Sequence, residues 1–527
     1  MIRKKSWVFC GSLTVAILTL SPACFAAADA GCAPDRSAVP HHAGGLVVAL
    51  PLGQAKRAPI PCVTPTGWRT NEMGLAVTNA GTILIGPAFP EAGSPIGLIR
   101  SGDQGSTWSS IVPPNSPARL DVFDGNVGLD RGTGRAFWIT PGYFDPSISE
   151  TSGMWFSDDD GKTWSAGGNP TMQPPSGHAD SMKIFAGPPT NTSKEKMKGY
   201  PNVLYNCGAH KPQRCQASYD GGLTWGPTVG LPFPAELAPI QGALNDCSAF
   251  GLNGVVGEDG TVYFGYTPCN RPYVAISRDE AQSWQTVQVA NVETIGYGMA
   301  GVAIDRAGNL YSAWVAASDR LPYLAVSRDG GATWSTPMMI GAPGVNEAAL
   351  PKVVAGKRGQ VAVGYYGSEN SPGAPFPPKC PGATNTCPAY QNETWNTYIT
   401  ESFDALSRQP LFWSASINDP AIPSSYGCTP SSTGVIRLDE SLPFFSGGGY
   451  ARGCWGAQDY FAMVMDRNDT PWVGFQQDCL GVPGNPNCPS TFVGTPVDRI
   501  GAPTGKFFAI AGRLVGSKGD DSGDGND

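Results

Sequence analysis

The stretch Ser101-Gly-Asp103-Gln-Gly105-Ser-Thr107-Trp108 recurs four more times along the chain, with the common pattern Ser-x-Asp-x-Gly-x-Thr-Trp. The other copies are Ser157 to Trp164, Ser218 to Trp225, Ser277 to Trp284 and Ser327 to Trp334. Successive copies begin 50 to 61 residues apart. A repeat at such a period predicts an architecture built from similar structural units placed side by side.

The residue types of this stretch predict a tight turn. The Asp103 carboxylate can accept hydrogen bonds from backbone N–H groups a few residues further on. Gly105 permits a positive φ, and Trp108 supplies an apolar plate that can pack against a neighbouring unit. Each copy therefore predicts a hairpin between two antiparallel strands, with its tryptophan in the core rather than on a sugar-binding surface. The fourth copy has Ala281 and Ser283 in place of Gly and Thr, so a less regular turn is expected there.

The residues between the copies supply three further strands per unit. In the fifth unit, the apolar runs Ala300–Asp305 and Asn309–Val315 flank the turn residues Ala307-Gly-Asn309. Four strands in about 50 residues is typical of a propeller blade. A sixth unit follows with inner strands at Pro351–Ala355 and Gln360–Tyr366, and with Ser402-Phe-Asp404 as a remnant of the turn.

A seventh unit contains Tyr460–Met465, Pro471–Gln476 and Phe507–Leu514, but no fourth strand follows. Gly45–Leu50 can supply that strand and close the ring, which would otherwise present open edges. The sequence thus predicts an all-β propeller with seven blades, and six blades as the alternative. The expected division is a signal peptide at 1–28, an N-terminal segment at 29–66, the propeller at 67–516 and a disordered acidic tail at 517–527.

The N-terminus has the features of an export signal. Arg3, Lys4 and Lys5 precede an apolar run, Trp7 to Leu20, that is short for a membrane span. Small residues before Asp29 offer a cleavage site. We therefore expect a secreted or periplasmic protein without a membrane span. Lipid anchoring through Cys24 or Cys32 is disfavoured by the residues that precede them.

Twelve of the 14 cysteines follow the signal, and an even number in an exported chain predicts disulfides. Sequential pairing would join Cys32 to Cys62, Cys207 to Cys215, Cys247 to Cys269, Cys380 to Cys387, Cys428 to Cys454 and Cys479 to Cys488. A metal site is disfavoured because there is no Cys-x-x-Cys and only 4 His, and no cofactor is expected. The long insertions Gly367–Trp395 and Asn418–Ala457 each contain one such pair, which favours ordered, disulfide-stapled loops.

The net charge of −8 excludes nucleic acid and anionic membrane surfaces as general partners. It also means that an acidic ligand would need a local cationic pocket. We expect a monomer whose partner is a glycan or a glycoconjugate.

Propeller geometry predicts where a site can form. The repeated turns lie on one face, whereas the entries to the first strands and the loops between the second and third strands surround the axis on the opposite face. Polar residues at the entries are Arg69, Glu72, Asp121, Asp124, His178, Asp180, Asp246, Glu347, Asp459 and Tyr460. Those in the second-to-third loops are Glu91, Asp145, His210, Arg271, Asp319 and Arg320. Such a set suits sugar binding, although polar loops at a propeller mouth often bind only water.

The repeated stretch resembles the Asp box, or BNR repeat, of the sialidase (neuraminidase) superfamily. Asp boxes also occur in sortilin-like receptors, xyloglucanases and photosystem assembly factors, so the resemblance implies a fold more than an activity. A similarity to exported bacterial proteins of the sialidase family extends from about Arg69 to Val515. Asn71-Glu72, Tyr200-Pro-Asn-Val and Leu321-Pro-Tyr are the phrases that carry it.

The resemblance implies a site of three arginines that grip a carboxylate, a tyrosine nucleophile with a glutamate partner, and an aspartate acid/base. Arg69 in Trp68-Arg69-Thr70 is the counterpart of the first arginine, although the Ile-Pro of the family motif is missing. Arg271 and Arg320 match the other two by loop position only. Tyr366 or Tyr460 would be the nucleophile, and Glu347 its partner.

The remaining family position is less well matched. The loop expected to hold the aspartate contains only Glu91. The leading hypothesis is a glycoside hydrolase of exo-sialidase type whose catalytic residues are Arg69, Glu347, Tyr366, Asp459 and Tyr460. Its substrate-binding residues would be Glu72, Glu91, His178, Asp180, Asp246, Arg271 and Arg320. The alternatives are a non-catalytic propeller that binds glycan or protein, and a polysaccharide lyase.

Overall fold

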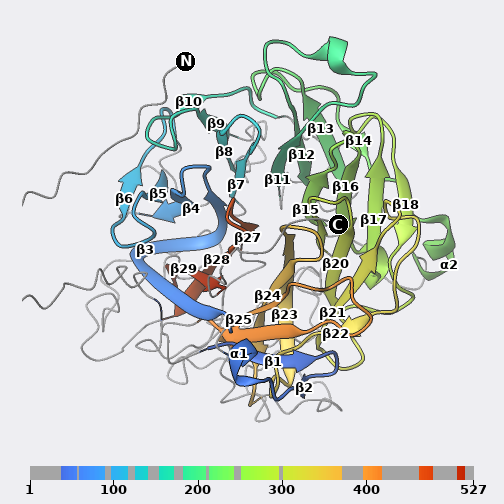
Figure 1. The fold of residues 1–527 in the computed structure, drawn as a ribbon. Helices are drawn as coiled ribbons and strands as arrows, with labels where there is room; N and C mark the ends of the chain where they lie inside the picture. Colours follow the sequence, from blue (N-terminus) through green and yellow to red (C-terminus); the bar gives the residue numbers. More distant parts are fainter. Residues whose placement is uncertain are drawn as a thin grey trace, which may run out of the picture.

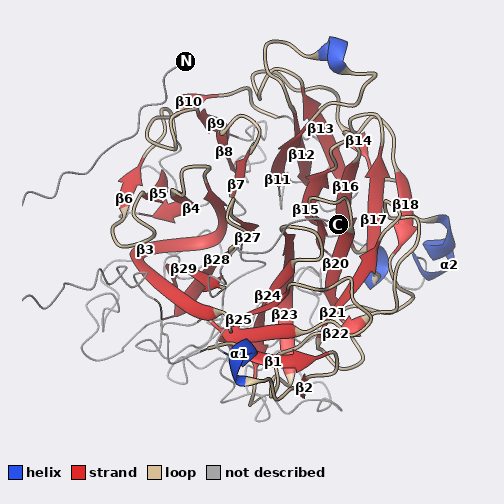
Figure 2. Cartoon of the chain, viewed as in Figure 1, coloured by secondary structure: helices blue, strands red, loops and turns tan. Residues whose placement is uncertain are grey.

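The computed structural model shows a seven-bladed β-propeller of four-stranded antiparallel sheets arranged around a central axis (Figure 1). It describes residues 32, 37–55, 58–89, 97–116, 125–140, 153–170, 182–208, 213–241, 251–295, 301–370, 396–417, 462–478 and 507–516. Helix is confined to short segments, as Figure 2 shows. The prediction of seven blades is confirmed, and the six-bladed alternative was wrong.

Each blade runs from an inner strand at the axis to an outer strand. Blade one comprises the second half of β3 (Ile60–Val77), β4 (Ile83–Phe89), β5 (Gly97–Ser101) and β6 (Ser109–Ile111). Blade two comprises β7 (Asn126–Leu129), β8 (Ala136–Thr140), β9 (Gly153–Ser157) and β10 (Ser165–Ala166). Blade three comprises β11 (Lys183–Gly187), β12 (Val203–Gly208), β13 (Arg214–Ser218) and β14 (Val229–Gly230). Blade four comprises β15 (Gly251–Val256), β16 (Val262–Tyr266), β17 (Tyr273–Ser277) and β18 (Gln285–Gln288).

The last three blades follow the same order. Blade five comprises β19 (Gly301–Ile304), β20 (Leu310–Val315), β21 (Pro322–Ser327) and β22 (Met338–Met339). Blade six comprises β23 (Glu347–Ala355), β24 (Val361–Ser368), β25 (Asn396–Ser402) and β26 (Phe412–Ser416). Blade seven comprises β27 (Ala462–Met465), β28 (Pro471–Asp478), β29 (Phe507–Val515) and the first half of β3. The short helices are α1 (Leu52–Ala55), α2 (Ala238–Gln241), η1 (Lys194–Lys196), η2 (Ala235–Leu237) and η3 (Pro268–Asn270).

The inner strands pack closely because small residues face the neighbouring blade. A Cβ on Gly74 would lie 2.2 Å from the backbone nitrogen of Val127, and one on Gly254 would lie 2.1 Å from the ring of Phe185. All seven inner strands contact the inner strand of the next blade around the ring. The apolar cores lie between blades, as the cluster of Leu84 in blade one with Trp138 in blade two illustrates.

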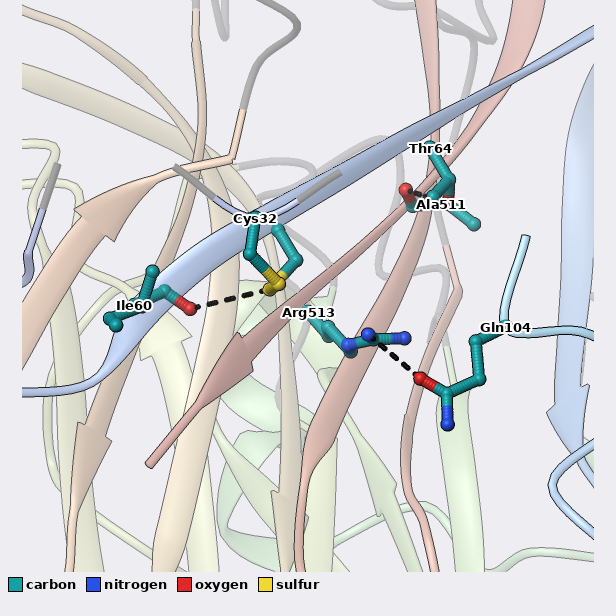
Figure 3. Close-up of a disulfide and its surroundings, with 7 residues drawn as sticks. Cys32, Ile60, Thr64, Gln104, Ala511 and Arg513 are labelled. Atoms are coloured by element: carbon teal, nitrogen blue, oxygen red, sulfur yellow. Dashed lines mark hydrogen bonds between the residues drawn. A yellow bond between two sulfur atoms is a disulfide. The ribbon is translucent and has the colours of Figure 1, made fainter. Parts of the chain in front are cut away.

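Strand β3 closes the ring by serving two blades. Residues from Ile60 to Pro65 pair with β29, and residues from Thr70 to Val77 pair with β4. Figure 3 shows this closure, where the Thr64 hydroxyl donates to the carbonyl of Ala511 at 2.9 Å. The disulfide Cys32–Cys62 attaches the preceding segment to the same strand.

The closing strand is therefore not the one expected from the sequence. Leu46 and Val47, within the predicted Gly45–Leu50, form β2 (Leu46–Val47), which pairs with β1 (Val39–His42). Strand β1 in turn pairs with β26 at the outer edge of blade six. The prediction failed because Ile60–Pro65 lies in a Pro-rich stretch without strand-like alternation, whereas Gly45–Leu50 is a continuous apolar run.

The predicted turn chemistry is present in all five copies, between the third and fourth strands of blades one to five. In the second copy the Ser157 hydroxyl donates to Asp159 at 2.9 Å and accepts from the N–H of Gly161 at 2.9 Å. Asp159 also accepts from the N–H of Thr163 at 2.8 Å and from its hydroxyl at 2.6 Å. These bonds outweigh the effect of desolvation and lower the pKa of Asp159 to about 2. The tryptophans Trp108, Trp164, Trp225, Trp284 and Trp334 pack against the cores between blades.

The fourth turn is as regular as the others, contrary to expectation. Ala281 adopts φ +62°, and its N–H donates to the Ser277 hydroxyl at 2.9 Å. Asp279 holds the N–H and hydroxyl of Ser283 as the other copies hold their threonine. The turn accepts alanine because the carboxylate network fixes the left-handed conformation that an L-residue otherwise resists.

In three of the five turns, the side chain of the residue after the turn aspartate connects its blade to the preceding one, a role that the sequence did not reveal. Asp160 of blade two accepts from Arg100 of blade one at 3.1 Å. Glu280 of blade four accepts from the N–H of Thr190 in blade three at 2.8 Å and is fully buried. Gln104 of blade one accepts from Arg513 of blade seven at 3.0 Å (Figure 3). The turns therefore fix contacts between blades as well as ending strands.

Two predicted disulfides, Cys32–Cys62 and Cys207–Cys215, are confirmed. Cys269 is also disulfide-bonded, and its expected partner Cys247 lies outside the described residues. The predicted signal, the C-terminal tail and the remaining cysteine pairs also lie outside them. Among the described residues, no helix is long and apolar enough to cross a membrane.

Ser157→Ala is expected to lower the free energy of unfolding by about 1–3 kcal/mol, because it leaves the buried N–H of Gly161 without its acceptor. Equilibrium urea unfolding would measure the change. Ser165→Ala is the control, because Ser165 is exposed on the next strand and should change stability by less than about 0.5 kcal/mol. Equal effects of the two substitutions would contradict the role given to the turn serine.

Candidate functional site

Arg320 and Glu347, both predicted from the sequence, meet at the propeller mouth. Arg320 lies in the loop between β20 and β21 of blade five, and Glu347 begins β23, the inner strand of blade six. Arg320 Nη1 donates to Glu347 Oε1 at 2.6 Å. The two residues are only 7% and 1% exposed, so the ion pair is buried. A buried charge is stable only when it is paired and hydrogen-bonded, as here.

The backbone of the loop places Arg320 at this position. Arg320 has φ +56°, its N–H donates to Ala316 at 2.9 Å, and its carbonyl accepts from Ala348 of blade six at 2.7 Å. Asp319 stabilises the same loop by accepting from the N–H of Leu321 and the hydroxyl of Tyr323. Burial, together with that hydrogen bond, raises the pKa of Tyr323 to about 12. Asp319 therefore holds the loop in shape.

Tyr366 lies next to this pair on β24. The strand register places Glu347 opposite Ser368 and Ala349 opposite Tyr366. Tyr366 is thus the diagonal neighbour of Glu347, at a typical separation of about 7–8 Å between such positions. Tyr366 is 2% exposed and packs in the core between blades six and seven. The structure thereby groups three of the predicted residues at one side of the mouth.

Arg69 lies where β3 passes from blade seven to blade one. Its backbone is opposite Phe508 of β29 and Phe89 of β4, so it lies at a junction between the two blades. Glu72 falls in the β3 bulge between Thr70 and Gly74. For both residues, the described structure gives the backbone position and not the side chain.

Arg271 follows η3 in the loop between β16 and β17 of blade four and is half-buried. Its N–H donates to the carbonyl of Pro268 at 3.1 Å. No contact between described residues joins it to Arg320 or Glu347. Several predicted site residues lie outside the described part of the chain, namely Glu91, His178, Asp180, Asp246, Asp459 and Tyr460.

A cavity of about 280 Å³ lies on the axis, lined by the inner strands of all seven blades. Its polar lining includes Asn126, Lys183, Asn253, Lys352 and Arg131. Of the described lining residues, three are cationic and none carries a carboxylate. Asp466 and Asp469 interact electrostatically with Arg131, so the local cationic environment that an acidic ligand would require is provided by Lys183 and Lys352.

The two lysines are held on blades three and six, each beside an asparagine. Lys183 and Lys352 are 4% and 7% exposed. Asn126 accepts from the N–H of Ile184, adjacent to Lys183, at 3.0 Å. Asn253 donates to the carbonyl of Val302 at 2.8 Å and accepts from its N–H at 3.0 Å. These amides connect neighbouring inner strands and fix the walls of the cavity.

These axial residues were not predicted from the sequence. The available signal was a single charged or amide side chain inside an apolar inner strand, as for Lys183 in Ser181–Phe185 and Lys352 in Pro351–Ala355. Because inner strands face the axis on one side, a polar residue there points to a lined cavity. Arg131 lies at the opposite end, where its guanidinium donates to the carbonyl of Met465 and burial lowers its pKa.

No protein-family model matches the chain, and no curated protein matches it. Similar solved structures include the Hadza microbial sialidase Hz136, with 18% identity and a TM-score of 0.38 over 56% of this chain and 63% of that one. YCF48 bound to D1 peptide has 11% identity and a TM-score of 0.44, covering 91% and 97%. An α-L-arabinanase of Penicillium chrysogenum has 15% identity and a TM-score of 0.36, covering 57% and 91%. At these identities, none of the activities in those descriptions is transferred to this chain.

Proposed function

We propose that this protein binds a glycan at the propeller mouth and processes it as a glycoside hydrolase of sialidase type. The observation that supports this most is the axial cavity, whose described lining carries Lys183, Lys352 and Arg131 without a carboxylate. Lysine and arginine side chains form charge-assisted hydrogen bonds with the carboxylate of an acidic sugar. The ion pair of Arg320 with Glu347 and the neighbouring Tyr366 would then border the bound ring.

In this proposal Arg69 orients the acidic sugar. A tyrosine, either Tyr366 or Tyr460 with Glu347 as its partner, attacks the anomeric carbon as the glycosidic C–O bond breaks, and Asp459 gives its proton to the leaving oxygen. Water then cleaves the tyrosyl–sugar bond while Asp459 takes up its proton. A tyrosine suits this role because a carboxylate nucleophile would be repelled by an anionic sugar. Assay of the purified protein on sialosides and on a wider glycoside panel is the direct test. Retained binding without turnover on any member would remove the enzyme proposal.

A non-catalytic glycan-binding propeller is the second candidate. The observation that favours it is that Arg320 already engages Glu347 at 2.6 Å, so the carboxylate is part of a structural pair. In this case Glu347→Gln would change stability but not ligand affinity. In the hydrolase, the same variant would lose turnover with affinity preserved, and Arg69→Ala would lose both.

Lys352→Met is expected to weaken the binding of an acidic glycan by about 10- to 100-fold, because it removes a charge-assisted hydrogen bond from the cavity. Isothermal titration with matched acidic and neutral oligosaccharides would measure this, with little change for the neutral ligand. Lys357→Met is the matched control, because Lys357 is exposed in the β23–β24 hairpin at the other end of the blade. Equal affinity of Lys352→Met and the parent protein would exclude the axial cavity as the binding site.

A further inference from the structure

A chain of buried hydrogen bonds crosses blade six and ends at His41. The Tyr365 hydroxyl accepts from the N–H of Ala342 at 2.7 Å and lies 3.0 Å from Thr400 Oγ1. Thr400 Oγ1 lies 2.6 Å from Ser414 Oγ, which lies 2.7 Å from His41 Nε2. The four side chains are between 0% and 3% exposed, so each proton in the chain needs a protein partner.

The direction in which these hydrogen bonds point can be deduced from the Tyr365 end of the series. Because the Tyr365 oxygen accepts from Ala342, its own proton must go to Thr400, and the protons of Thr400 and Ser414 then point toward His41. His41 Nε2 is therefore the terminal acceptor. His41 Nδ1 lies 3.1 Å from the carbonyl of His42, which can only accept, so Nδ1 carries the proton. In this arrangement His41 is neutral.

Protonation of His41 would disrupt every bond in the chain. Nε2 would become a donor, and Ser414 and Thr400 would have to reverse. The Tyr365 oxygen would then accept from both Thr400 and Ala342, so its own proton would have to leave Thr400 and turn toward Ser414, which would already accept from His41. A poor fit at that position would leave a buried donor unsatisfied. An unsatisfied buried donor costs about 1–3 kcal/mol, in addition to the cost of burying the imidazolium charge.

The groups around His41 do not offset that charge. Strand β26, against which β1 packs, carries no titratable side chain, nor does β2. His42 is adjacent on the same strand and acts as a like charge. On β25, Tyr398 stacks on Tyr365, and Glu401 follows Thr400 in sequence, so its side chain lies on the opposite face of the sheet.

His41 belongs to an N-terminal arm (residues 37–55) that, among the described strands, pairs only with blade six. Two further backbone hydrogen bonds hold the arm, from Gly44 to Met339 of blade five at 2.9 Å and from Ala38 to Pro59 at 2.8 Å. Strand β1 pairs with β26 through Val39 to His41, and β2 pairs only with β1. The Cys32–Cys62 disulfide closes a covalent loop around the arm. The arm can therefore separate from blade six without leaving the protein.

We propose that His41 is a pH-sensitive latch that holds the N-terminal arm on blade six at neutral pH and releases it on acidification. Release would uncover the edge of β26, a row of backbone groups that can pair with another strand. The proposal is independent of the activity at the propeller mouth.

The pH range in which the arm is released follows from the difference in proton binding by His41 between the closed and the open arm. Desolvation by burial lowers the pKa of His41 in the closed arm, whereas the open arm would titrate near the ordinary value of about 6.5. The stability of closure is thus complete above about pH 6.5 and is lost as the pH falls below it. With one proton taken up on opening, the opening constant rises about tenfold per pH unit in that range.

The pH-dependent release of the arm can be tested by measuring the protection of backbone amides from hydrogen exchange in the full-length protein. Between pH 6.5 and 5.5, the amides of β1 should lose protection by about fivefold, while those of β8 in blade two keep theirs. His42→Gln should preserve the response, because His42 lies outside the chain of hydrogen bonds, with its Nδ1 3.0 Å from the carbonyl of Pro410. His41→Gln should abolish it. An unchanged protection of β1 in the parent protein, or a retained response in His41→Gln, would overturn the proposal.

A second measurement needs no variant. Nitrogen-15 spectra of the histidines at pH 7.5 should show His41 as the neutral tautomer with its proton on Nδ1. A proton on Nε2 at that pH would contradict the hydrogen-bond direction on which the latch depends.

Discussion

Arg320→Met is expected to lower the free energy of unfolding by about 3–5 kcal/mol, because it leaves the Glu347 carboxylate buried without its cation. The parent pair is joined at 2.6 Å, and Glu347 is 1% exposed. The double variant Arg320→Met/Glu347→Leu should recover most of the loss, since replacing both members removes the unpaired charge. Urea unfolding of the parent, both single variants and the double variant gives the coupling energy.

The control for this cycle is Arg358→Met, which removes an exposed cation from the β23–β24 hairpin and should change stability by less than about 0.5 kcal/mol. A loss below about 1 kcal/mol for Arg320→Met would show that the pair contributes no more than a surface ion pair. In that case water or another group must reach Glu347. The mouth would then be more open than the described residues indicate.

Glu401 is expected to make the protein less stable as the pH rises. Burial raises the pKa of Glu401 to about 8, and Asp469 adds to the shift while a hydrogen bond from Gln360 opposes it. The folded state thus binds this proton more tightly than the unfolded state, whose pKa is near 4.3. The stabilisation is complete below about pH 4.3 and is lost as the pH rises toward 8, by roughly 5 kcal/mol in all.

Glu401→Gln tests this directly, because the amide keeps the shape and cannot ionise. The variant should be more stable than the parent at pH 8, with the difference shrinking toward pH 5. Unfolding midpoints in urea across this range would show it. Glu258→Gln, at an exposed position of blade four, is the control, and its unfolding midpoint should equal that of the parent at each pH. Parallel pH profiles for parent and Glu401→Gln would mean that Glu401 ionises as an ordinary surface carboxylate.

The structural features that could be predicted from the sequence are those formed by residues close together along the chain. Each repeated turn closes within eight residues, so the hydrogen bonds of Ser157, Asp159 and Thr163 could be inferred from their spacing. The repeated turns identified blades one to five in the same way. The mouth positions of Arg320 and Glu347 also followed from the repeat, because the topology of one blade fixes which loops face the axis.

What the sequence could not reveal depends on contacts between distant segments. The contact of Arg320 with Glu347 joins adjacent blades, and the pairing of Ile60 with Val515 joins opposite ends of the propeller. The blade-connecting position after the turn aspartate was missed because its residue type varies, from Gln104 to Glu280. Lys183 and Lys352 were missed because each is a single polar residue in an apolar strand.

The closure of the ring by β3 has a consequence for how the protein folds. The first half of β3 leaves the ribosome early, but its partner β29 is the last of the described strands to be made. Blade seven therefore stays incomplete until translation reaches Val515, and its unpaired strands remain exposed to other nascent chains. Such long-range pairing favours slow folding, so export before folding and chaperone binding would both protect the chain during this interval.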